Sequence, residues 1–334
     1  MLKIGLLGAG HLGKIHLKCI LATSVYELVG FYDPNDKNAE AAITQHEVKR
    51  FERLEDLIAA VDVVDIVTPT VTHYDLAKQC LQAGKHVFVE KPLTHTLAEA
   101  EDLMRLAQEK AVKVQVGHVE RFNPALLSVE GTPFNPMFIE AHRLALFNPR
   151  GTDVSVVLDL MIHDLDVLLS LVPSEVKQIS ASGVAVVSDT PDISNARIEF
   201  ENGCVANLTA SRISMKQMRK MRLFQRDAYI SLDFLEKNAQ VVRLYDQGAA
   251  DVPDIEELME LNTQNGTKLI HIHMPEAEPV NAIKMELESL AESINQNTKP
   301  KVSIEDGYKA LKLAYQILEE IELRDNSIKA VVQK

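Results

Sequence analysis

The feature that most restricts the fold is the opening of the chain, where an apolar run leads directly into a glycine pattern. Leu2–Leu7 has the composition of a buried strand, and Gly8-Ala9-Gly10-His11-Leu12-Gly13 follows it before a helical stretch that reaches Leu21. The first glycine permits a tight turn, the second lets another molecule approach the backbone, and the third allows helix and strand to pack closely. The pattern predicts a strand, a turn and a helix whose N-terminus can bind an anion.

Over the first 120 residues, β-branched apolar runs alternate with helical stretches, which is typical of a parallel sheet covered by helices on both faces. We expect six strands, at Leu2–Leu7, Leu28–Tyr32, near Val48, Val61–Val67, His86–Val89 and Lys113–Val116. The predicted fold class is therefore α/β, a Rossmann doubly wound parallel sheet. A second α+β domain with a largely antiparallel sheet is expected to follow it.

The pattern changes after Arg121-Phe122-Asn123-Pro124, so we expect domains at 1–120 and 121–334. In the second domain an apolar helix is predicted over about Val154–Leu171, followed by alternating strands from Gln178 to about Tyr245. Glu201-Asn202-Gly203 has the Asn-Gly pair of a tight hairpin turn. Two amphipathic helices complete the expected elements, at about Asn281–Asn295 and Ile304–Leu323.

Composition restricts the functional classes. The 334 residues carry a net charge of −13, and 46% of them are hydrophobic, which is typical of a globular protein that does not bind nucleic acid. The basic stretch Arg212–Arg226 suits a strand with one solvated face, with a polyanion site as the alternative. No apolar run approaches the ~20 residues that cross a bilayer, and the opening residues do not resemble a signal peptide, so we expect a cytoplasmic protein. Cys19, Cys80 and Cys204 indicate buried thiols, and no metal is expected.

Asp33 lies twenty residues beyond Gly13, at the end of the second predicted strand. A carboxylate at this place accepts hydrogen bonds from the adenosine ribose of NAD and repels the additional phosphate of NADP. The turn and the acid together predict an NAD site. NADP is the less favoured alternative, because Lys37 lies close enough in sequence to pair with its phosphate. An incidental acid beside a glycine-rich turn is the alternative without a ligand.

A lysine is expected at the carboxyl edge of the parallel sheet. Glu90-Lys91-Pro92 directly follows the strand His86–Val89, and ligands of such folds bind at that edge. Lys91 can hydrogen-bond a hydroxyl there and, when desolvated, take part in proton transfer. The alternative is a surface lysine before a turn.

The predicted helix Val154–Leu171 is apolar nearly all round, yet it carries three polar residues on one side. At about 100° per residue, Asp159, His163 and Asp166 fall within a stripe roughly 60° wide. Either they form a buried structural network or they face a polar cavity. In a cavity, neutral His163 can accept a hydroxyl proton while a carboxylate orients its ring, and we favour this interpretation.

With Gly8–Gly13, Glu90-Lys91-Pro92 and Asp159-x-x-x-His163 in this order and spacing, the chain resembles the Gfo/Idh/MocA (glucose-fructose oxidoreductase and inositol dehydrogenase) family over essentially its full length. The resemblance implies an NAD(P)-dependent dehydrogenase of CH–OH groups with Lys91, Asp159 and His163 as the catalytic set. It implies cofactor contacts from Gly8, Gly10, His11, Leu12, Gly13, Asp33, Thr68, Pro69, His73, Glu90 and Lys91. A cis bond before Pro92 is also expected. Thr70 departs from the asparagine of many members.

Segments 117–124, 151–158 and 159–164 resemble the nucleotide-sugar branch of that family, the UDP-N-acetylglucosamine 3-dehydrogenases. The implied reaction oxidises the sugar 3-hydroxyl to a ketone. The implied substrate contacts are Lys91, Arg121, Asn123, Arg150, Asp159 and His163. Arg121, Arg143 and Arg150 are candidates for the diphosphate, although each could equally be a surface arginine. As is common in the family, we expect a homodimer or homotetramer.

Three other functions stay open at this point. The first is a dehydrogenase of a free sugar or inositol, which would differ only in the substrate pocket. The second is a non-catalytic, NAD-binding sugar-sensing regulator, against which the retention of Lys91, Asp159 and His163 argues. The third is a glycosidase that uses bound NAD for a redox-assisted elimination.

Overall fold

The structure is a computed structural model that describes residues 1–148, 154–249, 252, 258–264 and 266–332. Its Cα positions divide into two compact units. Unit 1 comprises Met1–Phe122 and Val280–Lys312, and unit 2 comprises Asn123–Pro279 and Leu313–Lys334. This division differs from the predicted domains 1–120 and 121–334, because a late segment of the chain returns to unit 1.

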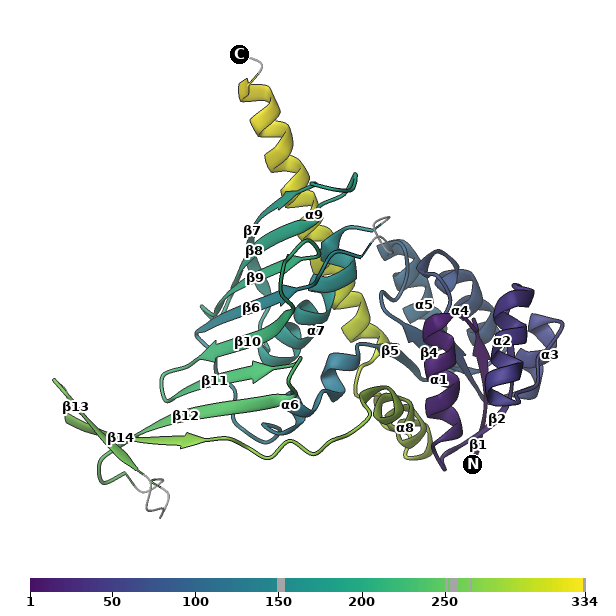
Figure 1. Cartoon of the computed structure of the whole chain (residues 1–334), viewed down its shortest axis with the longest axis horizontal. Coiled ribbons are helices and arrows are strands. Elements are labelled where there is room, and N and C mark those ends of the chain that lie inside the picture. The colour runs from purple at the N-terminus through teal and green to yellow at the C-terminus, as the bar shows by residue number, and fades with distance from the viewer. Residues whose placement is uncertain (149–153, 250–251, 253–257, 265, 333–334) are drawn as a thin grey trace. The chain divides into compact units, whose positions relative to one another are not determined.

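Unit 1 contains a five-stranded parallel sheet in the order β2-β1-β3-β4-β5, the predicted Rossmann architecture (Figure 1). The strands are β1 (Leu2–Leu7), β2 (Tyr26–Tyr32), β3 (Val63–Ile66), β4 (His86–Glu90) and β5 (Val114–Gly117). The sixth strand expected near Val48 is wrong, since only an isolated bridge between Phe31 and Arg50 forms there. The strand order reverses between β1 and β3, and ligands of this fold bind beyond the carboxyl ends of the strands at such a point.

The helices of unit 1 are α1 (His11–Leu21), α2 (Asp36–His46), α3 (Leu54–Ala60), α4 (His73–Gln82), α5 (Leu97–Lys110) and α8 (Ala282–Asn295), with 3-10 turns at Thr70–Thr72 and Val119–Phe122. Helix α8 belongs to this unit because its apolar residues Leu287, Leu290 and Ala291 are buried in one cluster with residues of α1 and the sheet. Each of these three side chains is at most 1% exposed. This burial is the physical reason why the C-terminal part of the chain does not form a purely separate domain.

Unit 2 contains a nine-stranded sheet in the order β13-β14-β12-β11-β10-β6-β9-β8-β7. All neighbouring strands are antiparallel except the pair β6 and β9, so the sheet is largely antiparallel, as predicted. The strands are β6 (Phe138–Leu144), β7 (Val176–Val184), β8 (Ile193–Phe200), β9 (Val205–Ser211), β10 (Met218–Phe224), β11 (Ala228–Asp233), β12 (Asn238–Asp246), β13 (Met259–Thr263) and β14 (Gly266–His273). The hairpin predicted at Asn202-Gly203 is confirmed, with Gly203 at a φ of +86°.

The helical elements of unit 2 are α6 (Pro124–Leu127), a π-helical turn (Val157–Met161) and α7 (Ile162–Leu171). Helix α9 (Ile304–Val332) contributes its residues up to Lys312 to unit 1 and the remainder to unit 2. The core of unit 2 lies where α7 and α9 pack on one face of the sheet, through residues such as Leu165, Leu168 and Ile317. Among the residues that the structure describes, no helix has the length and apolar character to cross a membrane.

Candidate active site

The turn after β1 is packed so tightly that two of its glycines admit no side chain. A Cβ on Gly13 would lie 1.9 Å from the carbonyl oxygen of Gly8, and a Cβ on Gly8 would lie 2.7 Å from that of Val67. A Cβ on Gly10, in contrast, would meet no atom within 4 Å. Helix α1 begins at His11 with no acidic side chain in its first turn. The turn therefore leaves a helix N-terminus and an open space beside Gly10, the arrangement that accommodates a pyrophosphate.

Asp33 follows β2 and is fixed beside this turn. Its Oδ2 accepts a hydrogen bond from the Ala9 amide at 2.7 Å, and its Oδ1 accepts one from the Asn35 amide at 2.8 Å. The residue is 5% exposed. Arg50 donates from Nη2 to the Asp33 carbonyl oxygen at 3.0 Å and to Asp36 Oδ1 at 2.8 Å. The predicted acid thus has a defined orientation, and an arginine that the sequence analysis did not single out lies next to it.

His73 links the end of β3 to the turn that follows β4. Its Nε2 lies 2.8 Å from the carbonyl oxygen of Thr68, and its Nδ1 lies 3.0 Å from that of Pro92. Burial lowers the pKa of His73, although two carbonyl acceptors favour the protonated ring. The Thr68 hydroxyl also accepts a hydrogen bond from Thr72 at 2.8 Å. His73 therefore braces the two loops at the carboxyl edge of the sheet, where Lys91 is also located.

Lys91 directly follows β4 and is partly exposed. Its amide donates to Oε2 of Glu90 at 3.2 Å, and the predicted cis bond before Pro92 is confirmed. The neighbouring imidazole of His118 is 1% exposed. Burial, and then the positive charges of Lys91 and Arg121, lower the pKa of His118 to about 3. A neutral imidazole therefore lies in the electric field of Lys91.

In unit 2, the helix predicted over Val154–Leu171 begins later and is not uniform. A π-helical turn, Val157–Met161, precedes α7, and such turns are rare and are frequently found at functional sites. Asp159 lies in the π-helical turn and His163 in the first turn of α7, and both are partly exposed. Asp166 is only 2% exposed, so Asp159 and His163 are the accessible members of the predicted stripe.

The residue after His163 forms a buried ion pair. Arg143 on β6 donates from Nε to Asp164 Oδ2 at 3.0 Å and from Nη2 to Asp164 Oδ1 at 2.8 Å. Arg143 and Asp164 are each 3% exposed. Because its guanidinium is buried on Asp164, Arg143 is corrected from a candidate diphosphate ligand to a residue that holds α7 against the sheet.

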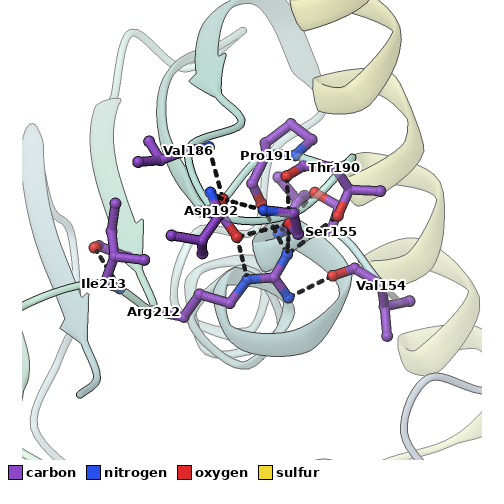
Figure 2. Close-up of polar contacts among 12 residues, drawn as sticks. Val154, Ser155, Val186, Thr190, Pro191, Asp192, Arg212 and Ile213 are labelled. Atoms are coloured by element: carbon purple, nitrogen blue, oxygen red, sulfur yellow. Dashed lines mark hydrogen bonds and ion pairs between the residues drawn. The ribbon is translucent and has the colours of Figure 1, made fainter. Parts of the chain in front are cut away.

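A second buried ion pair fixes the start of the π-helical turn, and Figure 2 shows its contacts. Arg212 donates from Nε to Asp192 Oδ1 at 2.8 Å and from Nη1 to the Val154 carbonyl oxygen at 2.6 Å. The Val156 amide donates to the carbonyl oxygen of Pro191 at 3.0 Å. Arg212 is 4% exposed, so the solvated face predicted for the strand in 212–226 does not include its first basic residue. Its guanidinium binds a carboxylate and loop carbonyls of its own chain.

Both oxygens of Asp192, the carboxylate of this ion pair, accept several hydrogen bonds. Its Oδ2 accepts from the amides of Val186 and Val187, each at 2.7 Å, and its Oδ1 accepts from the Ser188 hydroxyl at 2.7 Å. Burial alone would raise the pKa of Asp192, but these hydrogen bonds and Arg212 hold it well below its usual range. The loop before β8 and the entry to the π-helical turn are thereby joined at one ionised carboxylate.

The remaining predicted site residues differ in their surroundings. His11 and Leu12 are exposed at the start of α1. Arg121 donates to the Lys301 carbonyl oxygen at 3.3 Å. Asn123 caps α6 through the Ala125 amide and donates to the carbonyl oxygen of Phe234, which gives it a structural role in unit 2. Arg150 lies outside the described residues.

Comparison with known proteins places the chain in a family. A model described as the oxidoreductase family with an NAD-binding Rossmann fold matches residues 2–118, and the GFO/IDH/MocA C-terminal domain model matches residues 134–230. A UDP-N-acetylglucosamine 3-dehydrogenase of Acidithiobacillus ferrooxidans is 40% identical over 255 residues, which are 76% of this chain and 80% of that protein. The chain belongs to the GFO/IDH/MocA oxidoreductase family. The predicted family is confirmed, and with it a dehydrogenase that uses a nicotinamide cofactor.

A solved structure and one further relative are also similar to this chain. A solved structure of the A. ferrooxidans UDP-N-acetylglucosamine 3-dehydrogenase superposes with a TM-score of 0.86 and 34% identity, covering 96% of this chain and 98% of that chain. The scyllo-inositol 2-dehydrogenase (NAD(+)) of Bacillus subtilis is 31% identical over 234 residues, 64% of this chain and 68% of that protein. Both relatives are named as dehydrogenases, one of UDP-N-acetylglucosamine and one of scyllo-inositol.

Proposed function

We propose that this chain is an NAD-dependent dehydrogenase that oxidises the 3-hydroxyl of a nucleotide sugar such as UDP-N-acetylglucosamine. The observation that carries the proposal is the 40% identity to the UDP-N-acetylglucosamine 3-dehydrogenase of A. ferrooxidans. In structure that similarity extends over 96% of the chain. The nucleotide diphosphate and the sugar ring are the two parts of the substrate that the chain would have to recognise.

The residues around the glycine turn fit a dinucleotide. The free space beside Gly10 and the N-terminal turn of α1, which carries no acidic side chain, suit a pyrophosphate, and a Cβ at Gly10 would extend into that space. The buried carboxylate of Asp33 supports NAD over NADP, because its negative charge opposes the 2′-phosphate. Arg50 and Lys37 are the cations that would pair with that phosphate if NADP were used instead. When bound, the nicotinamide supplies the hydride acceptor of the oxidation.

Three side chains of this chain are proposed to act on the sugar. Lys91 would donate a hydrogen bond from Nζ to the reacting hydroxyl oxygen. Either Lys91 Nζ or the imidazole of His163 would accept the hydroxyl proton, and Asp159 would orient the partner that accepts it. Arg121, Asn123 and Arg150 are proposed only as further substrate contacts, and the homodimer or homotetramer remains a prediction.

The test is to incubate the purified protein with NAD or NADP and a panel of UDP-sugars, free hexoses and inositols. Formation of reduced nicotinamide is followed by absorbance and the products by mass, with a keto acid added to regenerate a tightly held cofactor. We expect oxidation of a UDP-N-acetylhexosamine with NAD. Absence of reduction and of product with every compound would overturn the dehydrogenase proposal.

Two variants test the proposed roles. Lys91→Met and His163→Gln are each expected to lower turnover by about 10²-fold, because general acid–base groups contribute at this scale. Binding of NAD should change little in either variant. Lys110→Met, at the exposed end of α5, is the matched control and should retain full activity. Loss of NAD binding in the first two variants would show that these side chains hold the cofactor and do not carry the proton transfer.

A dehydrogenase of a free inositol is the second candidate. The observation that favours it is the 31% identity to the scyllo-inositol 2-dehydrogenase of B. subtilis. The same substrate panel separates the two candidate functions, since an inositol dehydrogenase would oxidise a substrate that carries no nucleotide group. Preference for inositol over the UDP-sugar would replace the first proposal.

A further inference from the structure

Four ionisable side chains meet in the interior of unit 1. His16 of α1 lies with its Nδ1 3.0 Å from Asp65 Oδ2 on β3 and its Nε2 3.2 Å from Glu90 Oε1 on β4. Glu286 of α8 has a carboxylate oxygen within 4.8 Å of the His16 and Glu90 atoms. His16, Asp65 and Glu286 are fully buried, and Glu90 is 9% exposed. We call these four residues the His16 cluster.

The His16 cluster contains more acid than base. With a neutral imidazole and three ionised carboxylates, it would hold three negative charges in the interior, which is strongly unfavourable. Burial opposes a charge on His16, but the carboxylates of Asp65 and Glu90 more than offset this and raise its pKa well above the usual value. Burial, and then the charge of Glu90, raise the pKa of Glu286 well above its usual value. Two protons, one on His16 and one on Glu286, leave a single negative charge.

Glu90 is held from three directions. The His16 ring faces its Oε1, the Lys91 amide donates to its Oε2, and Gly117 on β5 lies directly against the carboxylate. A Cβ on Gly117 would lie 2.9 Å from Oε1 of Glu90, so a larger residue would displace the carboxyl group. The orientation of Glu90 is thereby transmitted to the backbone at Lys91.

We propose that His16 is a positioning residue for Lys91: as an imidazolium held by Asp65, it binds the Glu90 carboxylate and fixes the turn that carries Lys91. Glu286 closes the His16 cluster as a neutral carboxylic acid. His16 lies on the helix that opens at the glycine turn, so one ring connects the proposed phosphate-binding helix with the proposed catalytic lysine. This inference rests on the proposed role of Lys91.

A divalent cation is the main rival occupant of the His16 cluster. His16, Glu90 and Glu286 could each offer one ligand atom, and His16 donating to Asp65 resembles the support that metal-binding histidines receive. Both carboxylate oxygens of Glu286 lack a hydrogen-bond partner in the structure. His16 Nε2 likewise makes no hydrogen bond among the residues that the structure describes, but it lies 3.2 Å from Glu90 Oε1, within ion-pair distance, so a positive charge on the ring is balanced there without a metal.

The first measurement concerns the protonation of His16 and needs no substrate. Protein labelled with ¹⁵N in histidine is titrated by NMR from pH 6 to 9, with His16→Gln used to assign the His16 signals. The expected result is a His16 ring protonated on both nitrogens at pH 7. The groups that face this ring are Asp65 on β3, Glu90 on β4, Glu286 on α8 and Cys19 on α1 itself. A His16 ring that is neutral at pH 7 would overturn the proposal.

The second measurement concerns Lys91. In His16→Gln, the backbone amide signal of Lys91 should shift, and kcat should fall by about 10- to 100-fold because a reacting group is misplaced. KM for NAD should change less than kcat. His46→Gln, on α2 outside the His16 cluster, is the matched control and should keep the wild-type signal and kcat. An unchanged Lys91 amide and unchanged kcat in folded His16→Gln would overturn the proposal.

The third measurement separates protons from a metal. Elemental analysis of the purified wild-type protein should find no stoichiometric metal, and a chelator should leave its melting temperature unchanged. Stoichiometric zinc that is lost in Glu286→Gln would overturn the proposal in favour of a metal site. If no sugar is oxidised by the wild-type protein, the proposed function fails, while the NMR measurements still decide whether His16 is charged and whether it orders Lys91.

Discussion

The two units bury carboxylates in opposite ways. In unit 2, Asp192 accepts hydrogen bonds from amides, a hydroxyl and a guanidinium, and its pKa is held low. In unit 1, Glu286 is also fully buried, but among the residues that the structure describes neither of its oxygens has a hydrogen-bond partner, and its pKa is raised. Neither side chain is exposed, so the neighbouring groups decide which form is stable: donors and a guanidinium surround Asp192, whereas Glu286 faces the charge of Glu90. The ionised Asp192 joins parts of unit 2 through its hydrogen bonds, whereas the buried Glu286 keeps its proton.

Removal of Asp192 is the strongest test of this contrast. Asp192→Ala leaves Arg212 buried without its carboxylate and should destabilise unit 2 by about 3–5 kcal/mol, the cost of breaking a buried ion pair. Denaturant unfolding, combined with hydrogen exchange of β8 and β9, measures the loss in that unit. Asp189→Ala, an exposed acid of the same loop, is the control and should have little effect. Wild-type stability in Asp192→Ala would mean that the ion pair does not hold the loop.

The contrast can also be tested with the buried pair of Arg143 and Asp164, because either charge can be removed alone or both together. Arg143→Met or Asp164→Leu alone should cost about 3 kcal/mol, because one charge remains buried and unpaired. The double variant should cost less than either single variant, since no charge remains. A double-mutant cycle from denaturant unfolding measures the coupling. Additive losses would show that the two residues act independently.

Glu286→Gln tests the stored proton through pH. Because the pKa of Glu286 is raised in the folded protein, wild-type stability should fall as pH rises above the unfolded value of 4.5, until the folded carboxyl ionises. A glutamine has no proton to lose, so the variant should gain on wild type by up to about 1.4 kcal/mol per pH unit in that window. Calorimetric melting at pH 5, 6, 7 and 8 measures the difference.

The control for this experiment is Glu292→Gln, an exposed glutamate on the same helix. Its melting temperature should follow that of wild type at every pH. Parallel curves for wild type and Glu286→Gln would contradict a neutral Glu286.

The smallest effect is expected for a pair that is not buried. Arg222 donates to Glu140 at 2.5 Å, but the two side chains are 40% and 32% exposed. Arg222→Ala should change the free energy of unfolding by no more than about 1 kcal/mol, because water already solvates both charges. The same denaturant series measures it. A loss as large as that of Asp192→Ala would show that pairing, and not burial, sets the energetic scale.

The sequence predicts the parallel sheet well because each of its five strands is a short, mostly apolar run ending at a turn, as in Leu2–Leu7. It also predicts the glycine turn, because all of the residues that this turn requires are neighbours in the sequence. The false strand near Val48 had the right residue type, but pairing there extends to a single bridge. A short apolar segment does not show by its sequence whether it will pair as a full strand or form only a single bridge.

The residues missed in the candidate site depend on contacts between distant segments. Glu286 lies on an amphipathic helix, where a glutamate normally indicates a solvated face, and only the return of α8 to unit 1 buries it. The π-helical turn likewise begins where Arg212 and Pro191 bind the backbone of residues 154 and 156. His16 does carry a sequence signal, because it falls among the buried positions of α1. A charged partner for it is not readable from periodicity.

The return of α8 to unit 1 also has a consequence for how the protein is made. The first 122 residues leave the ribosome with every strand of the parallel sheet, yet without Leu287, Leu290 and Glu286, which cover α1 and the His16 cluster. All of unit 2 up to Pro279 must be translated before that face is closed. Until residues 282–295 have been synthesised, unit 1 therefore exposes a charged and partly apolar surface to chaperones and proteases.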